Sequence, residues 1–99
     1  MITLKYVYKQ GEGDGNIKSL SDYLSLKSEE EDFEYEFLTY DEEYHKERGD
    51  AFKIKGGFGA RLTPFCVIYK DKEPLKAFYS EAGECNLGRI VGYLDNELI

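Results

Sequence analysis

The sequence predicts one α/β domain with a mixed four-stranded sheet and three helices, in the order β-α-β-α-β-β-α. Three observations support this prediction. The chain has 99 residues, which suits a single domain over residues 1–99 with a modest core. Segments that alternate apolar and polar residues, as strands do, recur between segments whose apolar residues are spaced as on one face of a helix. A short charged turn separates the last two predicted strands, as in a β-hairpin.

The first half of the chain predicts a strand, a helix and a second strand. In residues 2–8, Ile, Leu and Tyr alternate with Thr, Lys and Val, and the segment is rich in β-branched and aromatic residues, as strands are. A glycine-rich loop follows, and then a helix over residues 17–31 with Asn16 as its N-cap and Ile17, Leu20 and Leu24 on one face. Residues 33–40 alternate aromatic residues with glutamates, which predicts the second strand.

The second half predicts a helix, a hairpin and a final helix. Residues 41–52 begin with acidic residues and form a helix, although Gly49 weakens that prediction. The continuous apolar run over residues 64–69 is typical of a strand that is covered on both faces. Residues 70–73 form a turn, residues 74–80 a strand, and residues 87–98 an amphipathic helix. Two β-α-β-like steps predict a parallel strand pair with helices on the sheet faces, and the hairpin adds antiparallel strands.

The charge balance argues against several classes of partner. The formal net charge is −7, from 20 acidic and 13 basic residues, and no basic face is concentrated in the sequence. We therefore expect neither nucleic acid nor a membrane surface as a partner. No long apolar run or leader occurs, and the two cysteines do not form a secreted disulfide framework, so we expect a cytoplasmic protein.

A proline stands at the start of the third predicted strand, in the stretch Leu62-Thr63-Pro64, directly before residues 65–69. Proline donates no backbone hydrogen bond and therefore suits the first position of a strand. With the predicted element order, the 70–73 turn and the strand after it, this stretch resembles the thioredoxin-like superfamily, which includes thioredoxins and glutaredoxins. The turn over residues 83–87 is similar to the glycine-then-acid turn of glutaredoxins. The resemblance covers essentially the whole chain and implies that the Thr63–Pro64 bond is cis, with the Thr63 backbone facing a ligand.

The residues that carry redox chemistry in that superfamily are missing here. The resemblance places a reactive cysteine where the first strand meets the first helix, because a helix N-terminus lowers the pKa of a thiol. Residues 10–17 contain no Cys, Ser or Thr, and they carry the acidic residues Glu12 and Asp14 instead. The usual dithiol route is therefore not available to this chain, and we expect no cofactor.

The sequence thus predicts a non-catalytic binding or assembly module with a protein partner. The partner would dock on the loop over residues 11–16, residues 61–64 and the turn over residues 83–86, and an extended peptide would pair with the exposed Thr63 backbone. The candidate residues of this surface are Gly13, Asp14, Asn16, Arg61, Thr63, Pro64, Glu84 and Cys85.

Two other functions remain open at this point. One is a redox-related protein: either a glutathione binder that uses the Thr63 backbone and the turn at Glu84, or a monothiol protein that acts through Cys85. Glu12 and Asp14 would repel the anionic tripeptide. The other is a structural component of a larger assembly, such as a phage particle.

Other chemistry-bearing residues give weaker signals. Cys66 lies in the buried apolar run and is expected to be a core residue, and two thiols are favoured over a Cys66–Cys85 disulfide. The single histidine, His45, lies on a charged segment and is expected to be solvated. One histidine with scattered acids makes a poor metal site, so no metal is expected.

Overall fold

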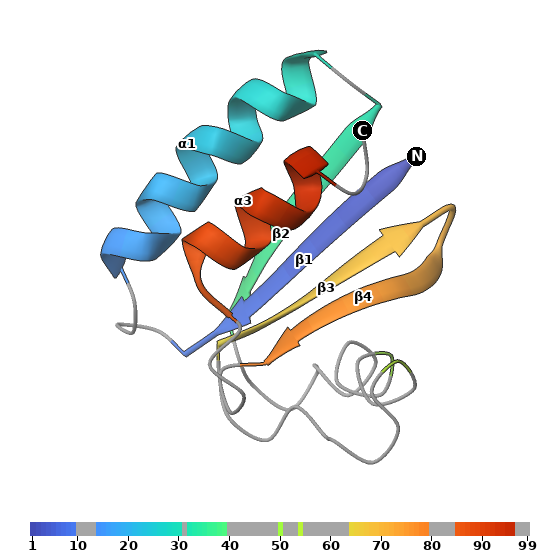
Figure 1. The fold of residues 1–99 in the computed structure, drawn as a ribbon. Coiled ribbons are helices and arrows are strands. Elements are labelled where there is room, and N and C mark those ends of the chain that lie inside the picture. Colours follow the sequence, from blue (N-terminus) through green and yellow to red (C-terminus); the bar gives the residue numbers. More distant parts are fainter. Residues whose placement is uncertain are drawn as a thin grey trace.

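The computed structural model describes residues 1–9, 14–30, 32–39, 50, 54, 64–79 and 85–96. These residues form a mixed four-stranded sheet with helices packed on it, so the predicted α/β class is confirmed (Figure 1). The elements are, in chain order, β1 (Ile2–Tyr8), α1 (Asp14–Glu30), β2 (Phe33–Thr39), β3 (Phe65–Lys70), β4 (Glu73–Tyr79) and α3 (Leu87–Asn96).

The four strands lie in the order β2-β1-β3-β4. Strands β1 and β2 are parallel, with Ile2 opposite Phe33, which confirms the predicted parallel pair. Strand β3 is antiparallel to β1 and to β4, which confirms the predicted hairpin. The second step of the chain, from β2 to β3, joins strands that run in opposite directions, because β3 pairs antiparallel with β1. Only the first of the two steps is therefore a parallel crossover.

The helices differ from the prediction in two respects. The described residues contain two helices instead of three, and the predicted helix over residues 41–52 falls outside them apart from Asp50. Helix α1 begins at Asp14, so Asn16 lies within the helix and the prediction that it is the N-cap is wrong. The earlier start places an acidic residue at the positive end of the helix macrodipole, where a negative charge is stabilising.

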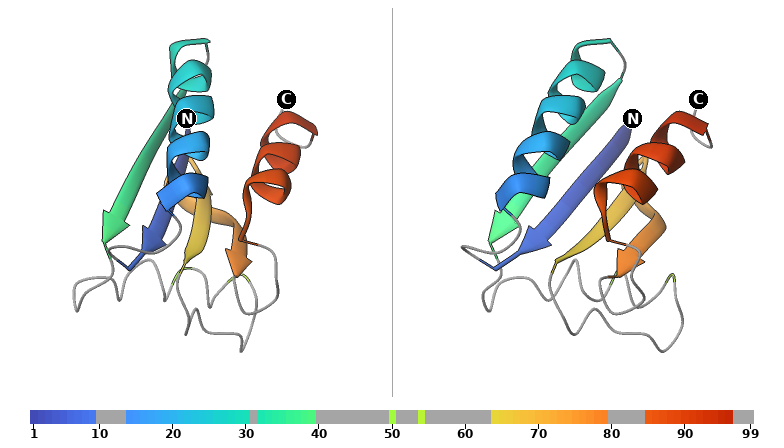
Figure 2. Two further views of the ribbon diagram at one scale, coloured as in Figure 1. Left: turned by 90° about the vertical axis from the view of Figure 1, so that its left-hand side faces the viewer. Right: turned by 60° about the vertical axis from the view of Figure 1, so that its left-hand side comes forward.

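Both helices cover the same face of the sheet (Figure 2). Because side chains alternate along a strand, every second residue of each strand points to the helices. The helix-facing core contains side chains from all four strands and from both helices: Leu4, Tyr6, Leu20, Leu24, Phe33, Cys66, Ile68, Phe78, Ile90 and Leu94.

The opposite face of the sheet carries a second, smaller core. Strand β3 contributes to both, and Phe65 to Tyr69 are each at most 3% exposed. This confirms that the apolar run is covered on both faces. Leu38 and Ile54 pack against the second core, which consists of Val7, Phe65, Val67, Tyr69, Ala77 and Tyr79.

A polar contact joins the two helices near their C-terminal ends. Lys27 of α1 is buried, and its Nζ lies 3.9 Å from Asp95 Oδ1 of α3. The hydroxyl of Tyr23 donates a hydrogen bond to the same carboxylate. A buried ammonium is costly without a counter-charge, so Asp95 compensates for the burial of Lys27.

Candidate functional site

Each of the four strands has one end at the same end of the sheet, where Tyr8 of β1 lies opposite Thr39 of β2. The register places Val7 of β1 opposite Phe65 of β3, and Phe65 opposite Tyr79 of β4. Pro64 precedes β3 here, and we refer to this end as the proline end. Helices α1 and α3 also begin toward it (Figure 1). The topology therefore brings together segments that are far apart in the sequence.

The proline end contains those residues of the predicted binding surface that the structure describes. Asp14 is the first residue of α1, and Asn16 lies in its first turn. Pro64 is half-buried directly before β3, and Cys85 lies two residues before α3. Gly13, Arg61, Thr63 and Glu84 are outside the described residues, and so is the Thr63–Pro64 peptide bond.

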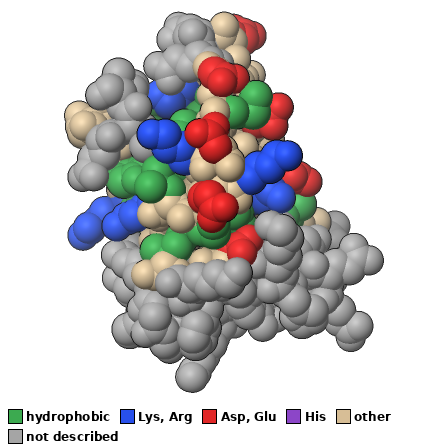
Figure 3. Space-filling view, turned by 90° about the vertical axis from the view of Figure 1, so that its right-hand side faces the viewer, with side chains coloured by type: hydrophobic (Ala, Val, Ile, Leu, Met, Phe, Trp, Pro, Cys, Tyr) green, Lys and Arg blue, Asp and Glu red, His purple; other side chains and the backbone are tan. Residues whose placement is uncertain are grey.

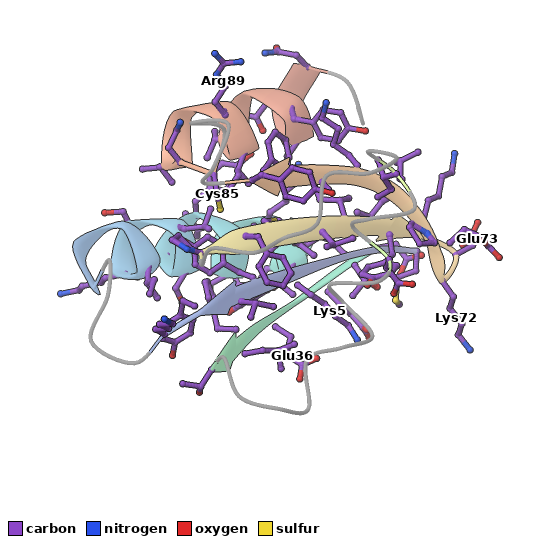
Figure 4. The ribbon with its side chains drawn as sticks, turned by 90° about the horizontal axis from the view of Figure 1, so that it is seen from below. Lys5, Glu36, Lys72, Glu73, Cys85 and Arg89 are labelled. Carbon is purple, nitrogen blue, oxygen red and sulfur yellow. The ribbon has the colours of Figure 1, made fainter. Side chains whose placement is uncertain are left out.

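Both cysteines are thiols, and they differ in access to solvent. Cys66 of β3 is completely buried, and this burial raises the pKa of its thiol well above the usual value. The charge of the Cys85 thiolate raises that pKa further. Cys85 is half-buried and lies between α3 and the strands in Figure 4. The predictions of a core role for Cys66 and of two thiols are confirmed.

The residue after Cys85 caps helix α3. The side-chain Oδ1 of Asn86 accepts a hydrogen bond from the backbone N–H of Arg89 at 2.9 Å. The Ile90 N–H donates to the Asn86 carbonyl at 3.1 Å, which is the first helical bond. Asn86 is thus the N-cap, and it occupies one of the N–H groups that an anion at this helix terminus would use. The sequence reasoning missed this cap, although an asparagine directly before an apolar helical stripe signals one.

A groove of about 470 Å³ lies on the sheet face opposite the helices, and the sequence reasoning did not find it. Figure 4 shows Lys5 and Glu36 on this face, on the side away from α3. Lys5 Nζ lies 5.7 Å from the centre of the Tyr69 ring. We call this site the open-face groove; its lining residues are Thr3, Lys5, Glu34, Glu36, Tyr69 and Lys72.

The floor of the open-face groove is held by a buried hydrogen bond. The hydroxyl of Tyr69 donates to Asp50 Oδ2 at 2.7 Å, and both residues are at most 8% exposed. The two lie 19 positions apart in the chain, so sequence patterns alone could not pair them. The bond fixes the Tyr69 ring beneath the Lys5 ammonium, where a cation is attracted to the aromatic face.

A smaller groove of about 350 Å³ lies between α3 and the edge strand β4. Lys76 Nζ lies 5.6 Å from the Phe78 ring and 5.8 Å from the Tyr93 ring, and Arg89 is exposed at the same groove. On the side of the molecule shown in Figure 3, basic and acidic side chains are interspersed with hydrophobic ones. Because both signs of charge are mixed there, that side does not form a basic face of the kind that binds nucleic acid.

The described residues contain neither a cluster of metal ligands nor a helix that could span a membrane. No three side chains of His, Cys, Asp or Glu come together among them in a way that would hold a metal ion. His45 lies outside these residues. Neither α1 nor α3, the two helices of the described residues, is long and apolar enough to cross a membrane.

Comparison of the chain with known protein families finds no matching family, and comparison with curated proteins finds no match.

Proposed function

We propose that the chain is a non-catalytic, thioredoxin-like module that binds a protein partner at the proline end of its sheet. One observation carries the proposal: the first turn of α1, Pro64 and Cys85 converge on that end, although they are separated by long stretches of sequence. A surface built from several loops on a rigid sheet is a common form of binding site.

The element order supports a thioredoxin-like fold. The parallel pair β1–β2 joined by α1, the β3–β4 hairpin and the final helix α3 agree with the order from which the resemblance was drawn. The place of Pro64 immediately before β3 also agrees with it. The cis geometry of the Thr63–Pro64 bond and the predicted helix over residues 41–52 are part of what we propose. Apart from Asp50 and Pro64, their residues lie outside the described ones.

The chemistry of the proline end favours binding over catalysis. Residues 10–17 supply no thiol or hydroxyl at the start of α1. Cys66 is buried with a raised pKa and is therefore a poor nucleophile, since the thiolate is the reactive form. Asn86 occupies an N–H group at the start of α3. A thiol pair activated by a helix terminus is thus absent from the described residues and from residues 10–17.

The partner that best fits this end is an extended segment of another protein. In the thioredoxin-like arrangement the Thr63 backbone is left to pair with such a segment, which would add as a strand. The excess of acidic residues favours a segment with basic residues over an anionic ligand such as glutathione. Asp14 begins α1 at this end, and Glu12 precedes it by two positions in the sequence.

Capture of the partner by charge-altered variants tests the proposal. The tagged chain is used to isolate binding proteins from its native source, with Asp14→Lys and Thr63→Lys as the test variants. Glu73→Lys is the matched control, because it makes the same charge change as Asp14→Lys at the β3–β4 turn, at the other end of the sheet. We expect the wild type and the control to retain the same protein, and each test variant to retain about tenfold less.

Two outcomes would count against the proposal. Equal capture by all variants, each shown to be folded by its thermal transition, would exclude the proline end as the docking surface. Saturable binding of glutathione in a calorimetric titration, lost in the Cys85→Ser variant, would instead favour the monothiol function.

A further inference from the structure

We propose that the outer edge of β2 binds a basic, extended segment of a partner protein as a fifth strand. This surface is distinct from the proline end and does not depend on the function proposed for that end. The proposal rests on the outer edge of β2, which no other described strand pairs with, on the direction of its backbone groups and on the charges beside it.

Strand β2 is the less protected of the two sheet edges. Among the described strands it pairs only with β1, and it lies at the rim of the sheet in Figure 2. Its seven residues contain no proline and no lysine, and its pairing with β1 is regular. The opposite edge, β4, carries Pro74 and Lys76, and its pairing with β3 shifts register. Proline, charged side chains (above all lysine) and bulges are the usual means of preventing strand addition. The charged residues of β2 are both glutamates, so β2 is the edge that better accepts a strand, provided that the strand carries basic residues.

The strand register indicates which backbone groups of β2 point outward. Ile2 N–H donates to the Asp32 carbonyl at 3.2 Å, and Ile2 lies opposite Phe33. In a parallel ladder the groups of alternate residues face the neighbouring strand. Glu34 and Glu36 therefore direct their N–H and C=O groups to β1, while Tyr35 and Phe37 direct theirs outward. These outward groups are the ones that an added strand would bind.

The side chains of β2 specify the character of that strand. Glu34 and Glu36 are exposed and line the open-face groove, whereas Tyr35 and Phe37 are half-buried on the helix-covered face. Across the β1 side, Lys5 lies opposite Glu36, but Glu34 faces Thr3. Basic residues of an added strand would lie opposite the two glutamates from the outer side, and opposite charges at such cross-strand positions are stabilising.

The groove provides space for long basic side chains. It extends beside Glu34 and Glu36 and holds about 470 Å³. Its two lysines, Lys5 and Lys72, lie on β1 and on the hairpin turn, and Lys5 is positioned over the Tyr69 ring. An added strand would thus continue an alternation of charge across the sheet, from Lys5 through Glu36 to the partner's cation.

A second copy of this chain fits the same edge less well. Antiparallel pairing of two β2 strands around a two-fold axis would place the glutamates of one copy near those of the other. Like charges at cross-strand positions are destabilising. The charge pattern therefore favours a partner with Lys or Arg at every second position and apolar residues between them.

A synthetic peptide tests the proposal. The probe is a blocked seven-residue peptide that alternates Lys with Val and Tyr, and its affinity is measured by fluorescence anisotropy. We expect the wild-type chain to bind it, and the Glu34→Lys/Glu36→Lys variant to bind about tenfold or more weakly, because two attractive pairs become repulsive. The same variant is expected to gain affinity for the peptide in which Glu replaces Lys.

A matched control separates strand addition from general attraction between a cationic peptide and an acidic protein. The Asp22→Lys/Glu73→Lys variant makes the same change in net charge at exposed positions on α1 and β4 that do not line the open-face groove, and we expect it to bind like the wild type. In hydrogen exchange, bound peptide should slow the amides of Tyr35 and Phe37 and leave those of Glu34 and Glu36 unchanged. No binding to the wild type, equal weakening by the control variant, or equal binding of a peptide with its lysines clustered would overturn the proposal.

Discussion

The two cysteines show how the fold sets the chemistry of a single residue type. Cys66 points into the helix-facing core, where a thiolate would be strongly desolvated, so its pKa is raised. Cys85 is half-buried just before the α3 cap. Position in the strand pattern was enough to predict the role of Cys66, because it lies in an unbroken apolar run. The surroundings of Cys85 required the structure.

We predict that thiol labelling separates these two residues. With iodoacetamide near pH 8, Cys85 should react in the folded protein, whereas Cys66 should remain unmodified until the protein is unfolded, because it is inaccessible and protonated. Mass spectrometry of the digested protein measures both sites. The Cys85→Ser variant is the control and should show no labelling while folded. Similar rates for both cysteines in the native state would contradict the burial of Cys66.

At the scale of elements, the hairpin between β3 and β4 was predicted but not its backbone geometry. The turn residues Asp71 and Lys72 have φ angles of 51° and 72°. Two positive φ angles in a two-residue turn match the right-handed twist of the strands, and glycine or asparagine usually supplies them. The Asp71 N–H also donates to the Met1 carbonyl at 2.9 Å, which joins the turn to the start of β1. The charged turn residues themselves gave no indication of this conformation.

We predict that Lys72→Gly stabilises the protein by about 0.5–1 kcal/mol, because glycine adopts a positive φ without the steric cost that a side chain imposes. The free energy of unfolding is measured by urea denaturation. Lys72→Ala is the matched control: it removes the same long side chain but keeps the β-carbon, so it should bring no such gain. If the glycine variant proves no more stable than the alanine variant, the turn does not have the positive φ described here.

Element positions followed from sequence where the apolar pattern was strong. The alternating aromatics of β2 and the continuous run of β3 both correspond to observed strands. Helix ends were less predictable, since α1 begins two residues before the predicted cap at Asn16. A helix start depends on the balance between several acidic and amide residues in a glycine-rich loop, and local pattern does not decide between them.

At the scale of the whole molecule, the order of the strands decides where function can reside. The sequence predicts a parallel pair and a hairpin, but it does not show that β1 lies between β2 and β3. That arrangement leaves β2 at an edge and gathers the strand ends at the proline end. The open-face groove could not be predicted for the same reason, because Glu34, Lys5 and Tyr69 come from three different strands.

The candidate site was predicted from sequence only in part. Asp14, Asn16, Pro64 and Cys85 came from widely separated segments, and the register places those segments toward one end of the sheet. The Asn86 cap and the β2 edge were not anticipated. The cap has a local signal, because an asparagine stands directly before the apolar helical stripe. The place of β2 at an edge depends instead on the order of the strands, which is a property of the tertiary structure.

The central claim is that a protein partner docks on the proline end, and hydrogen exchange of the captured complex tests it most directly. We predict that the partner slows exchange at residues 14–17, 65–66 and 86–89, and leaves the β3–β4 turn at residues 71–72 unchanged. Protection confined to that turn, or no protection at any of the three proline-end segments, would contradict the claim.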